Sequence, residues 1–124
     1  MNTFKKSERL CDRKSTENLF SKGTSFFEEP FRCIYLKVDD KRISSIKTQI
    51  VIPKRNIPKA VNRNLIKRHI KEVFRNNKLH LISNLEEKQA KIDLSIIYQS
   101  KDILSFLVIE EKIKLSLVRL NSKL

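Results

Sequence analysis

The sequence predicts an α+β fold of the α/β sandwich type, in which about four strands of a mixed sheet pack against three helices in the order α-β-β-β-α-β-α. Three observations predict it. Short segments with strand-like alternation are interspersed with longer segments whose apolar residues recur at helical spacing. The 124 residues suffice for one modest core. A single Gly and three Pro argue against disorder. We therefore expect one domain over residues 1–124, with residues 1–13 as a basic arm that is mobile or loosely docked.

The first element is predicted to be a short helix over residues 14–22. Ser15 or Thr16 can cap its N-terminus, because a hydroxyl oxygen accepts a hydrogen bond from a free backbone N–H there. Gly23 suits the position just beyond the C-terminus. Two apolar side chains are expected to face inward, namely Leu19 and Phe20.

Three segments that follow are predicted to be strands. Residues 31–38 alternate with apolar side chains on both faces, so both faces are expected to be covered at least partly. Residues 45–52 form a second strand, which could extend a hairpin and which Pro53 ends because proline cannot donate to a ladder. A short extra strand could lie near residues 24–27.

The second half of the chain predicts a helix, a loop, a strand and a last helix. The helix covers residues 60–78, the polar residues 80–91 are expected to form a loop, and residues 92–99 form the strand. Asp102 or Ser105 opens the last helix. The apolar stripe of that helix is expected to be Ile103, Phe106, Leu107, Ile113, Leu117 and Leu120.

Charge is the most informative property of the composition. The net charge of +13 and a pI near 10 favour a polyanionic partner, and both nucleic acid and an anionic membrane meet that requirement. The sequence has no apolar run near 18 residues and no apolar N-terminal stretch, so a cytoplasmic protein without a membrane partner is expected. Cys11 and Cys33 lack metal-ligand spacing and are expected to be reduced thiols.

Residues 54–78 concentrate this charge, with nine Lys or Arg against one acid, Glu72. At about 100° per residue, the apolar side chains of the helix fall on one arc and a separate arc is polar and cationic. We call the second arc the basic face; its members are Asn64, Lys67, Arg68, Lys71, Arg75 and Lys78. Cations four residues apart repel, so this face favours a phosphate backbone as its compensation. A solvated helix face and a membrane-bound amphipathic helix are the other interpretations.

Arg63 is the exception on this helix, because it falls inside the apolar arc. Its long side chain could escape to solvent at the helix start. It could instead reach a second RNA surface beside the sheet, in which case its role differs from that of the basic face.

These residues resemble the bacterial ribonuclease P protein family. The resemblance rests on Pro53-Lys54-Arg55, on Ala60-Val61 and on Arg63-Asn64-Leu65-Ile66-Lys67-Arg68, which stands where the family has an Arg-Asn-Arg-x-Lys-Arg helix. The segment Leu19-Phe20-x-x-Gly23-x-Ser25 lies at the matching distance upstream. The pattern covers nearly the whole chain.

The resemblance implies a protein subunit of a ribonucleoprotein whose large RNA, with bound Mg²⁺, cleaves the 5′ leader from precursor tRNA. The protein would supply no catalytic residue and hold no metal, and one protein would bind one RNA. The family fold carries a left-handed strand–helix–strand crossover. The resemblance implies that the RNA subunit is bound by Asn64, Lys67, Arg68, Lys71 and Arg75. It implies that a leader cleft is formed by Phe20, Tyr35, Lys54, Arg55 and Arg63, the last of which could serve either surface.

Two other functions remain open at this point. A non-catalytic RNA-binding module of ribosomal or RNA-chaperone type would show the same charge. A self-sufficient nuclease would need clustered acids, bases or metal ligands, and His69, Glu72 and His80 have no partner at such spacing.

Overall fold

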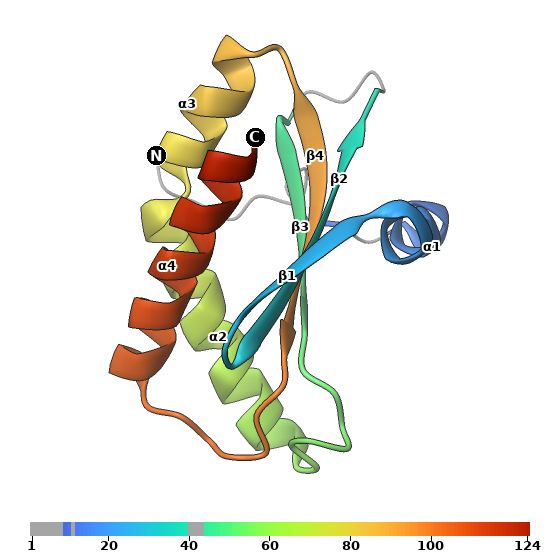
Figure 1. The fold of residues 1–124 in the computed structure, drawn as a ribbon. Helices are drawn as coiled ribbons and strands as arrows, with labels where there is room; N and C mark the ends of the chain where they lie inside the picture. The colour runs from blue at the N-terminus through green and yellow to red at the C-terminus, as the bar shows by residue number, and fades with distance from the viewer. Residues whose placement is uncertain (1–8, 11, 40–43) are drawn as a thin grey trace.

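The structure is a computed structural model that describes residues 9–10, 12–39 and 44–124. Most of the expected N-terminal arm, residues 1–8 and 11, lies outside the described residues, as does most of the turn after residue 38. The helices and strands of the described part, shown in Figure 1, are α1 (Arg13–Lys22), β1 (Thr24–Glu28), β2 (Phe31–Val38), β3 (Ile46–Val51), α2 (Ala60–Asn77), α3 (Leu79–Glu87), β4 (Lys91–Tyr98) and α4 (Phe106–Lys123).

The strands form one mixed sheet in the order β1-β2-β4-β3. β2 pairs antiparallel with both β1 and β4, and β3 pairs parallel with β4. The predicted hairpin between residues 31–38 and 45–52 is therefore wrong, because β4 lies between these strands. The reason is burial: seven of the eight residues of β4 are buried, including the polar residues Asp93 and Ser95, and a strand that is covered on both faces lies at the centre of a sheet.

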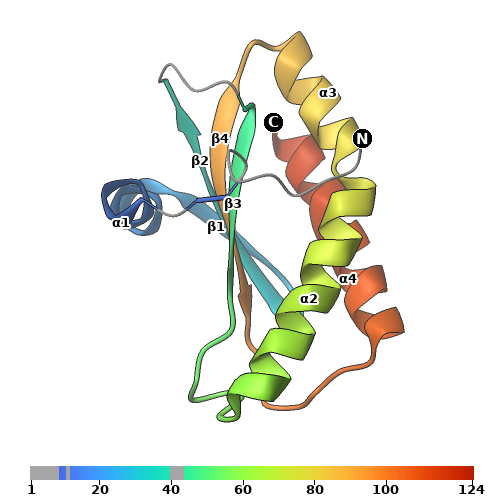
Figure 2. The ribbon, with the colours of Figure 1, turned by 180° about the vertical axis from the view of Figure 1, so that it is seen from behind.

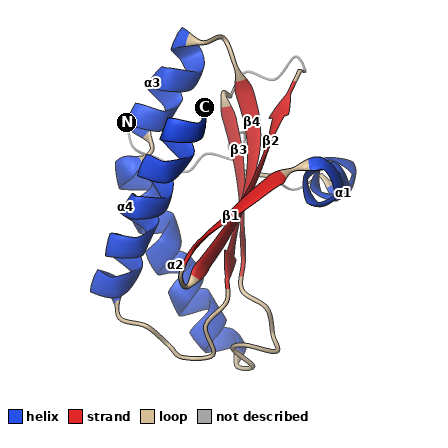
Figure 3. Ribbon diagram, viewed as in Figure 1, coloured by secondary structure: helices blue, strands red, loops and turns tan. Residues whose placement is uncertain are grey.

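Helices cover the two faces of the sheet unequally (Figures 1 and 2). α2, α3 and α4 cover one face, which we call the helical face, and α1 crosses the other, which we call the outer face. Viewed from the helical face with β3 and β4 pointing up, the chain moves leftward from β3 to β4, so the crossover through α2 and α3 is left-handed. The α+β class and its mixed four-stranded sheet are confirmed (Figure 3).

The helix α3 corrects the prediction of a loop over residues 80–91. Leu81 and Leu85 are buried, four residues apart on one side of this helix. Lys78 stays in the right-handed helical region and joins α2 to α3 without a loop. The polar residues around these two leucines outnumber them, which is why the segment resembles a loop in sequence.

The helix α4 begins at Phe106, and Ser105 is its N-cap because the Ser105 hydroxyl accepts a hydrogen bond from the Val108 N–H. Ile103 therefore precedes the helix and is exposed, which corrects its place in the apolar stripe. Leu107 is also exposed, whereas Ile109 is fully buried. Once the helix start is known, helical spacing accounts for both observations.

Around α1 the prediction needs two corrections. The N-cap is Asp12, whose Oδ2 accepts a hydrogen bond from the Ser15 N–H at 3.0 Å, instead of Ser15 or Thr16. Leu19 is fully buried on the outer face against Leu10, Ile34 and Ile97, as expected, but Phe20 is 45% exposed.

Gly23 ends α1 with an ordinary φ of −72°, so its role is not the left-handed conformation. A Cβ atom there would lie 2.4 Å from the Leu19 carbonyl oxygen and 2.7 Å from Ile34 Cγ2. Glycine is thus needed because α1 approaches β2 too closely for any side chain.

Candidate nucleic-acid interface

The helix α2 presents its basic face on the side away from the core. Asn64, Lys67 and Arg68 are exposed, and Lys71 and Arg75 are partly exposed. The buried side of α2 packs on the helical face of the sheet through Ile66, Ile70, Val73 and Phe74. The apolar arc is therefore confirmed, and five of the six members of the basic face are at least partly exposed.

Lys78 was predicted to belong to the basic face, but it is buried. Only 3% of Lys78 is exposed, because the chain continues directly into α3 at this position. The missed helix is the physical reason for this error: a loop would have left Lys78 in solvent.

Arg75 forms an ion pair within α2. Its Nη2 lies 2.5 Å from Glu72 Oε1, and the Asn76 amide donates to the same oxygen at 3.2 Å. The hydrogen bond from Arg75, followed by that from Asn76, lowers the pKa of Glu72. Part of the positive charge of Arg75 is therefore neutralised in the free protein.

Arg63 folds back onto the loop that precedes α2. Its Nη1 donates to the carbonyl oxygens of Ile57 and Pro58 at 3.0 and 2.6 Å. Asn56 in the same loop donates from Nδ2 to the carbonyl oxygen of Tyr98, at the end of β4. These bonds fix the loop from both sides, and the described contacts of Arg63 are with backbone at the helix start.

The same loop carries Lys54 and Arg55, and both are exposed. They follow Val51, the last residue of β3, at the end of the sheet where β4 also ends. Both cations therefore remain candidates for contact with RNA beside the outer face.

Tyr35 does not line a cleft with Phe20. Within β2, Tyr35 lies on the same face as Phe31 and Cys33 and packs against the core of the helical face, 6.3 Å from the ring of Phe26. Phe20 belongs to α1, on the outer face. Because β2 is apolar on both sides, alternation alone could not decide which side faces α1, and the prediction placed Tyr35 on the wrong one.

One row of side chains crosses the outer face from edge to edge. The strand registers pair Phe27 with Arg32, Arg32 with Ile97, and Ile97 with Val51. Phe27 is 58% exposed, and Arg32 Cζ lies 6.0 Å from the centre of its ring. We call Phe27, Arg32, Ile97 and Val51 the outer-face row. It offers an aromatic face beside a cation, the pair that single-stranded nucleic acid favours.

Sequence reasoning missed Phe27 and Arg32, although a signal was present. Phe26 and Phe27 are adjacent in a strand, so one must point to each face. Phe26 is 6% exposed and lies in the helical-face core, which leaves Phe27 on the outer face.

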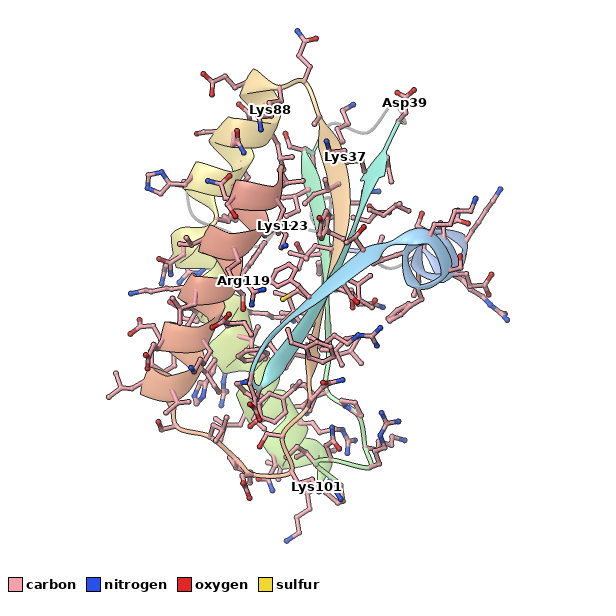
Figure 4. All side chains as sticks on the ribbon, in the orientation of Figure 1. Lys37, Asp39, Lys88, Lys101, Arg119 and Lys123 are labelled. Atoms are coloured by element: carbon pink, nitrogen blue, oxygen red, sulfur yellow. The ribbon has the colours of Figure 1, made fainter. Side chains whose placement is uncertain are left out.

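Two cations near the helical face have structural contacts. Arg119 and Lys123 point from α4 toward β1 (Figure 4) and lie 5.0 and 5.6 Å from the ring of Phe26. Arg119 also donates to the carbonyl oxygen of Phe27 and, at 2.7 Å, to Glu28 Oε2. These bonds attach α4 to the edge strand.

Metal-ligating side chains are scattered in the part of the chain that the structure describes, where no group of three or more His, Cys, Asp or Glu could hold an ion. Over the same residues, no helix has the length and hydropathy needed to span a membrane.

Comparison with known proteins decides the family. The sequence model of the family Ribonuclease P matches residues 4–120 of this chain. The chain belongs to the ribonuclease P protein family. The ribonuclease P protein component of Porphyromonas gingivalis is 30% identical over 116 residues, which cover 93% of this chain and 84% of that protein. The component of Petrotoga mobilis is 42% identical over 78 residues, 61% of each chain.

Solved structures agree with the family in fold. The ribonuclease P protein of Thermotoga maritima superposes with a TM-score of 0.68 at 26% identity, over 90% of this chain and 96% of that one. The protein of Staphylococcus aureus gives a TM-score of 0.71 at 23% identity, over 91% and 94%. The family match is consistent with the protein subunit of ribonuclease P, which implies partnership with ribonuclease P RNA, and the ribosomal or RNA-chaperone alternative is not favoured.

Proposed function

We propose that this subunit assists the RNA-catalysed removal of the 5′ leader from precursor tRNA by binding two RNAs on two separate surfaces. The basic face of α2 binds the ribonuclease P RNA. The outer-face row, with Phe20, Lys54 and Arg55 beside it, binds the single-stranded leader. Arg63 supports both surfaces indirectly, by holding the loop between them.

The observation that carries this proposal is the separation of the two surfaces. The basic face belongs to a helix that packs on the helical face of the sheet, whereas Phe27 and Arg32 lie on the outer face. Phosphate contacts from cations supply affinity without reading bases, which suits a large folded RNA. An exposed aromatic ring with a neighbouring guanidinium suits unstacked bases, at about 1–3 kcal/mol per stacked base.

Membership of the family supports the remaining parts of the proposal. One protein binds one RNA, in the cytoplasm. Mg²⁺ is bound mainly by the RNA and the substrate, and the cleavage step uses no side chain of this chain.

The test is reconstitution with ribonuclease P RNA and measurement of precursor-tRNA cleavage at low Mg²⁺. The protein is expected to stimulate cleavage over RNA alone, and absence of stimulation would contradict the assignment. Phe27→Ala is expected to weaken binding of precursor tRNA but not of mature tRNA. Arg68→Ala is expected to weaken binding of the RNA subunit instead.

Two matched controls complete the test. Tyr35→Phe keeps the packing on the helical face and is expected to leave both affinities unchanged. Lys88→Ala removes one positive charge at the C-terminal end of α3 (Figure 4), and it is expected to have little effect on either affinity. Equal effects of Phe27→Ala and Arg68→Ala on both RNAs would refute the two-surface proposal.

A further inference from the structure

The helix α4 carries large apolar side chains on its outward side as well as on its buried side. The buried side packs against the core of the helical face through Ile109, Ile113, Leu117 and Leu120. On the opposite side, Leu107 is 73% exposed and Val118 is 67% exposed. Single apolar side chains on a surface are ordinary, whereas several on the outward side of one helix mark a surface that can bind a partner.

Four exposed residues follow one line along this outward side. We call them the α4 seam, which consists of Leu107, Glu111, Lys114 and Val118. The steps between them are four, three and four residues, so at about 100° per residue they lie within about 60° of one another. Alternating steps of three and four residues are the spacing by which one helix packs along another.

The α4 seam reads apolar, charged, charged, apolar from either end, and its two charges are opposite in sign. When two such helices pack antiparallel about a two-fold axis, Leu107 meets the partner's Val118 and Glu111 meets the partner's Lys114. Both pairs have the same midpoint, between residues 112 and 113, so all four contacts form together and each is made twice. A parallel pair would instead place Glu111 against the partner's Glu111.

Val108 and Leu115 extend this contact on one side of the seam. They are 37% and 41% exposed and lie about 80–100° from Leu107 around the helix. A two-fold axis places this side of one helix beside the same side of the other, so Val108 comes within about one turn of the partner's Leu115. The apolar contact is therefore wider than the seam alone.

Lys114 is available for a new ion pair. Its Nζ lies 3.9 Å from Glu110 Oε2, and half of its side chain is exposed. An exposed pair at that distance contributes little, so a carboxylate on a second molecule can compete for this ammonium group.

The basic face of α2 stays accessible when α4 is covered. His69 is the residue of α2 that contacts α4, with its ring 5.2 Å from that of Phe106. Lys67 and Lys71 border β3, on the other side of α2. A partner on α4 therefore lies away from the surface that is proposed to bind RNA.

We propose that the α4 seam is a self-association surface on which a second copy of this chain docks antiparallel. The proposal goes beyond the proposed function, because it concerns the free protein and each copy keeps its own RNA-binding surfaces. The seam spans only about three helical turns, and two chains of charge +13 repel each other. We expect a weak dimer that is populated at high protein concentration and at a salt concentration that screens this repulsion.

Sedimentation equilibrium of the full chain measures the dimer directly. The apparent mass is expected to rise from that of the monomer toward that of the dimer as the protein concentration approaches the millimolar range. A monomer mass at every concentration would overturn the proposal.

Charge reversal tests whether the α4 seam is the surface used. Glu111→Lys places two lysines opposite each other at both ends of the central contact, and Lys114→Glu does the same with two carboxylates. Each variant alone is expected to raise the dimer dissociation constant about tenfold or more, because like charges then face each other. An equal mixture of the two variants is expected to associate, because every central pair is again of opposite sign. The double variant Glu111→Lys/Lys114→Glu is likewise expected to regain self-association.

Lys101→Glu is the matched control, because it makes the same change of charge in the loop before α4 (Figure 4) and is expected to leave the dimer unchanged. Melting curves check that each variant folds. Single variants that associate as the wild type does, or a mixture that stays monomeric, would overturn the proposal. All of these variants are expected to stimulate precursor-tRNA cleavage normally, so the two proposals can fail separately.

Discussion

In the free protein, the charged side chain of Arg63 stabilises the loop just before its own helix. Arg63→Gln removes a donor that serves the carbonyl oxygens of Ile57 and Pro58. The free energy of unfolding is expected to fall by about 1–2 kcal/mol, because these bonds come from a charged donor and are only partly buried. Urea unfolding measures this loss, and RNA titrations at several salt concentrations measure the slope. A stable variant with a strongly reduced slope would show that Arg63 belongs to the basic face instead.

Glu72 makes the free energy of unfolding depend on pH, and the hydrogen bonds from Arg75 and Asn76 determine the direction of that dependence. Its pKa is lowered in the folded protein, mainly by the hydrogen bond from Arg75. The unfolded state therefore binds a proton more readily, and this stabilisation is present above the unfolded pKa of about 4.3 and is lost as pH falls through the folded pKa. Melting curves of the wild type and Glu72→Gln should differ at pH 7 and converge in acid. A constant difference down to pH 3 would contradict the ion pair.

Single residues were predictable where a period or a motif constrained them and unpredictable where two faces were equally apolar. The positions of Lys67 and Arg68 follow from the helical period of their own segment. The side of Tyr35 depends on which helix covers which face of the sheet, and that is a property of the whole fold.

At the scale of elements, the position of α1 depends on the absence of a side chain at Gly23. Gly23→Ala would place a Cβ 2.4 Å from the Leu19 carbonyl oxygen. We expect a loss of about 1–3 kcal/mol, the usual cost of overpacking, and displacement of α1 from β2. Leader binding should weaken while affinity for the RNA subunit is retained, since α2 lies on the other face. Unchanged stability in chemical unfolding would show that α1 is not held against β2 at this point.

Some helices and strands can be predicted from the apolar pattern of their own residues, whereas others can be recognised only from the element that packs against them. α2 has a long apolar arc and a charged one, and β2 alternates over its whole length, so both were predicted within one residue at each end. The helix α3 buries only Leu81 and Leu85. Two buried residues are too few to indicate a helix in the sequence, and the side that they form is evident only from the contact of α3 with α4. The prediction that β3 pairs with β2 was wrong, because the residues of a strand show the same alternation whether it pairs in a hairpin or through a crossover.

At the scale of the molecule, the net charge is +13, and residues 54–78 contribute +8 of it, with nine Lys or Arg against one acid. If the interface neutralises five phosphates, log K for ribonuclease P RNA should fall against log salt with a slope of about −3.5 to −4.5. Filter binding between low and physiological salt measures this slope. A slope near zero would mean that the charge is solvated and that affinity comes from other contacts.

The central position of β4 has a consequence for how the chain is made. β4 joins β2 to β3, and β3 reaches it only through a crossover of two helices. A ribosome synthesises α2 well before β4, so the nascent chain carries a cationic helix whose apolar side has no completed sheet to cover it. Contacts between distant segments are slow to form, so the core must assemble late, near the end of synthesis. Until β4 is in place, the apolar side of α2 has no completed sheet to pack on, so the most basic segment of the chain stays partly unpacked until then.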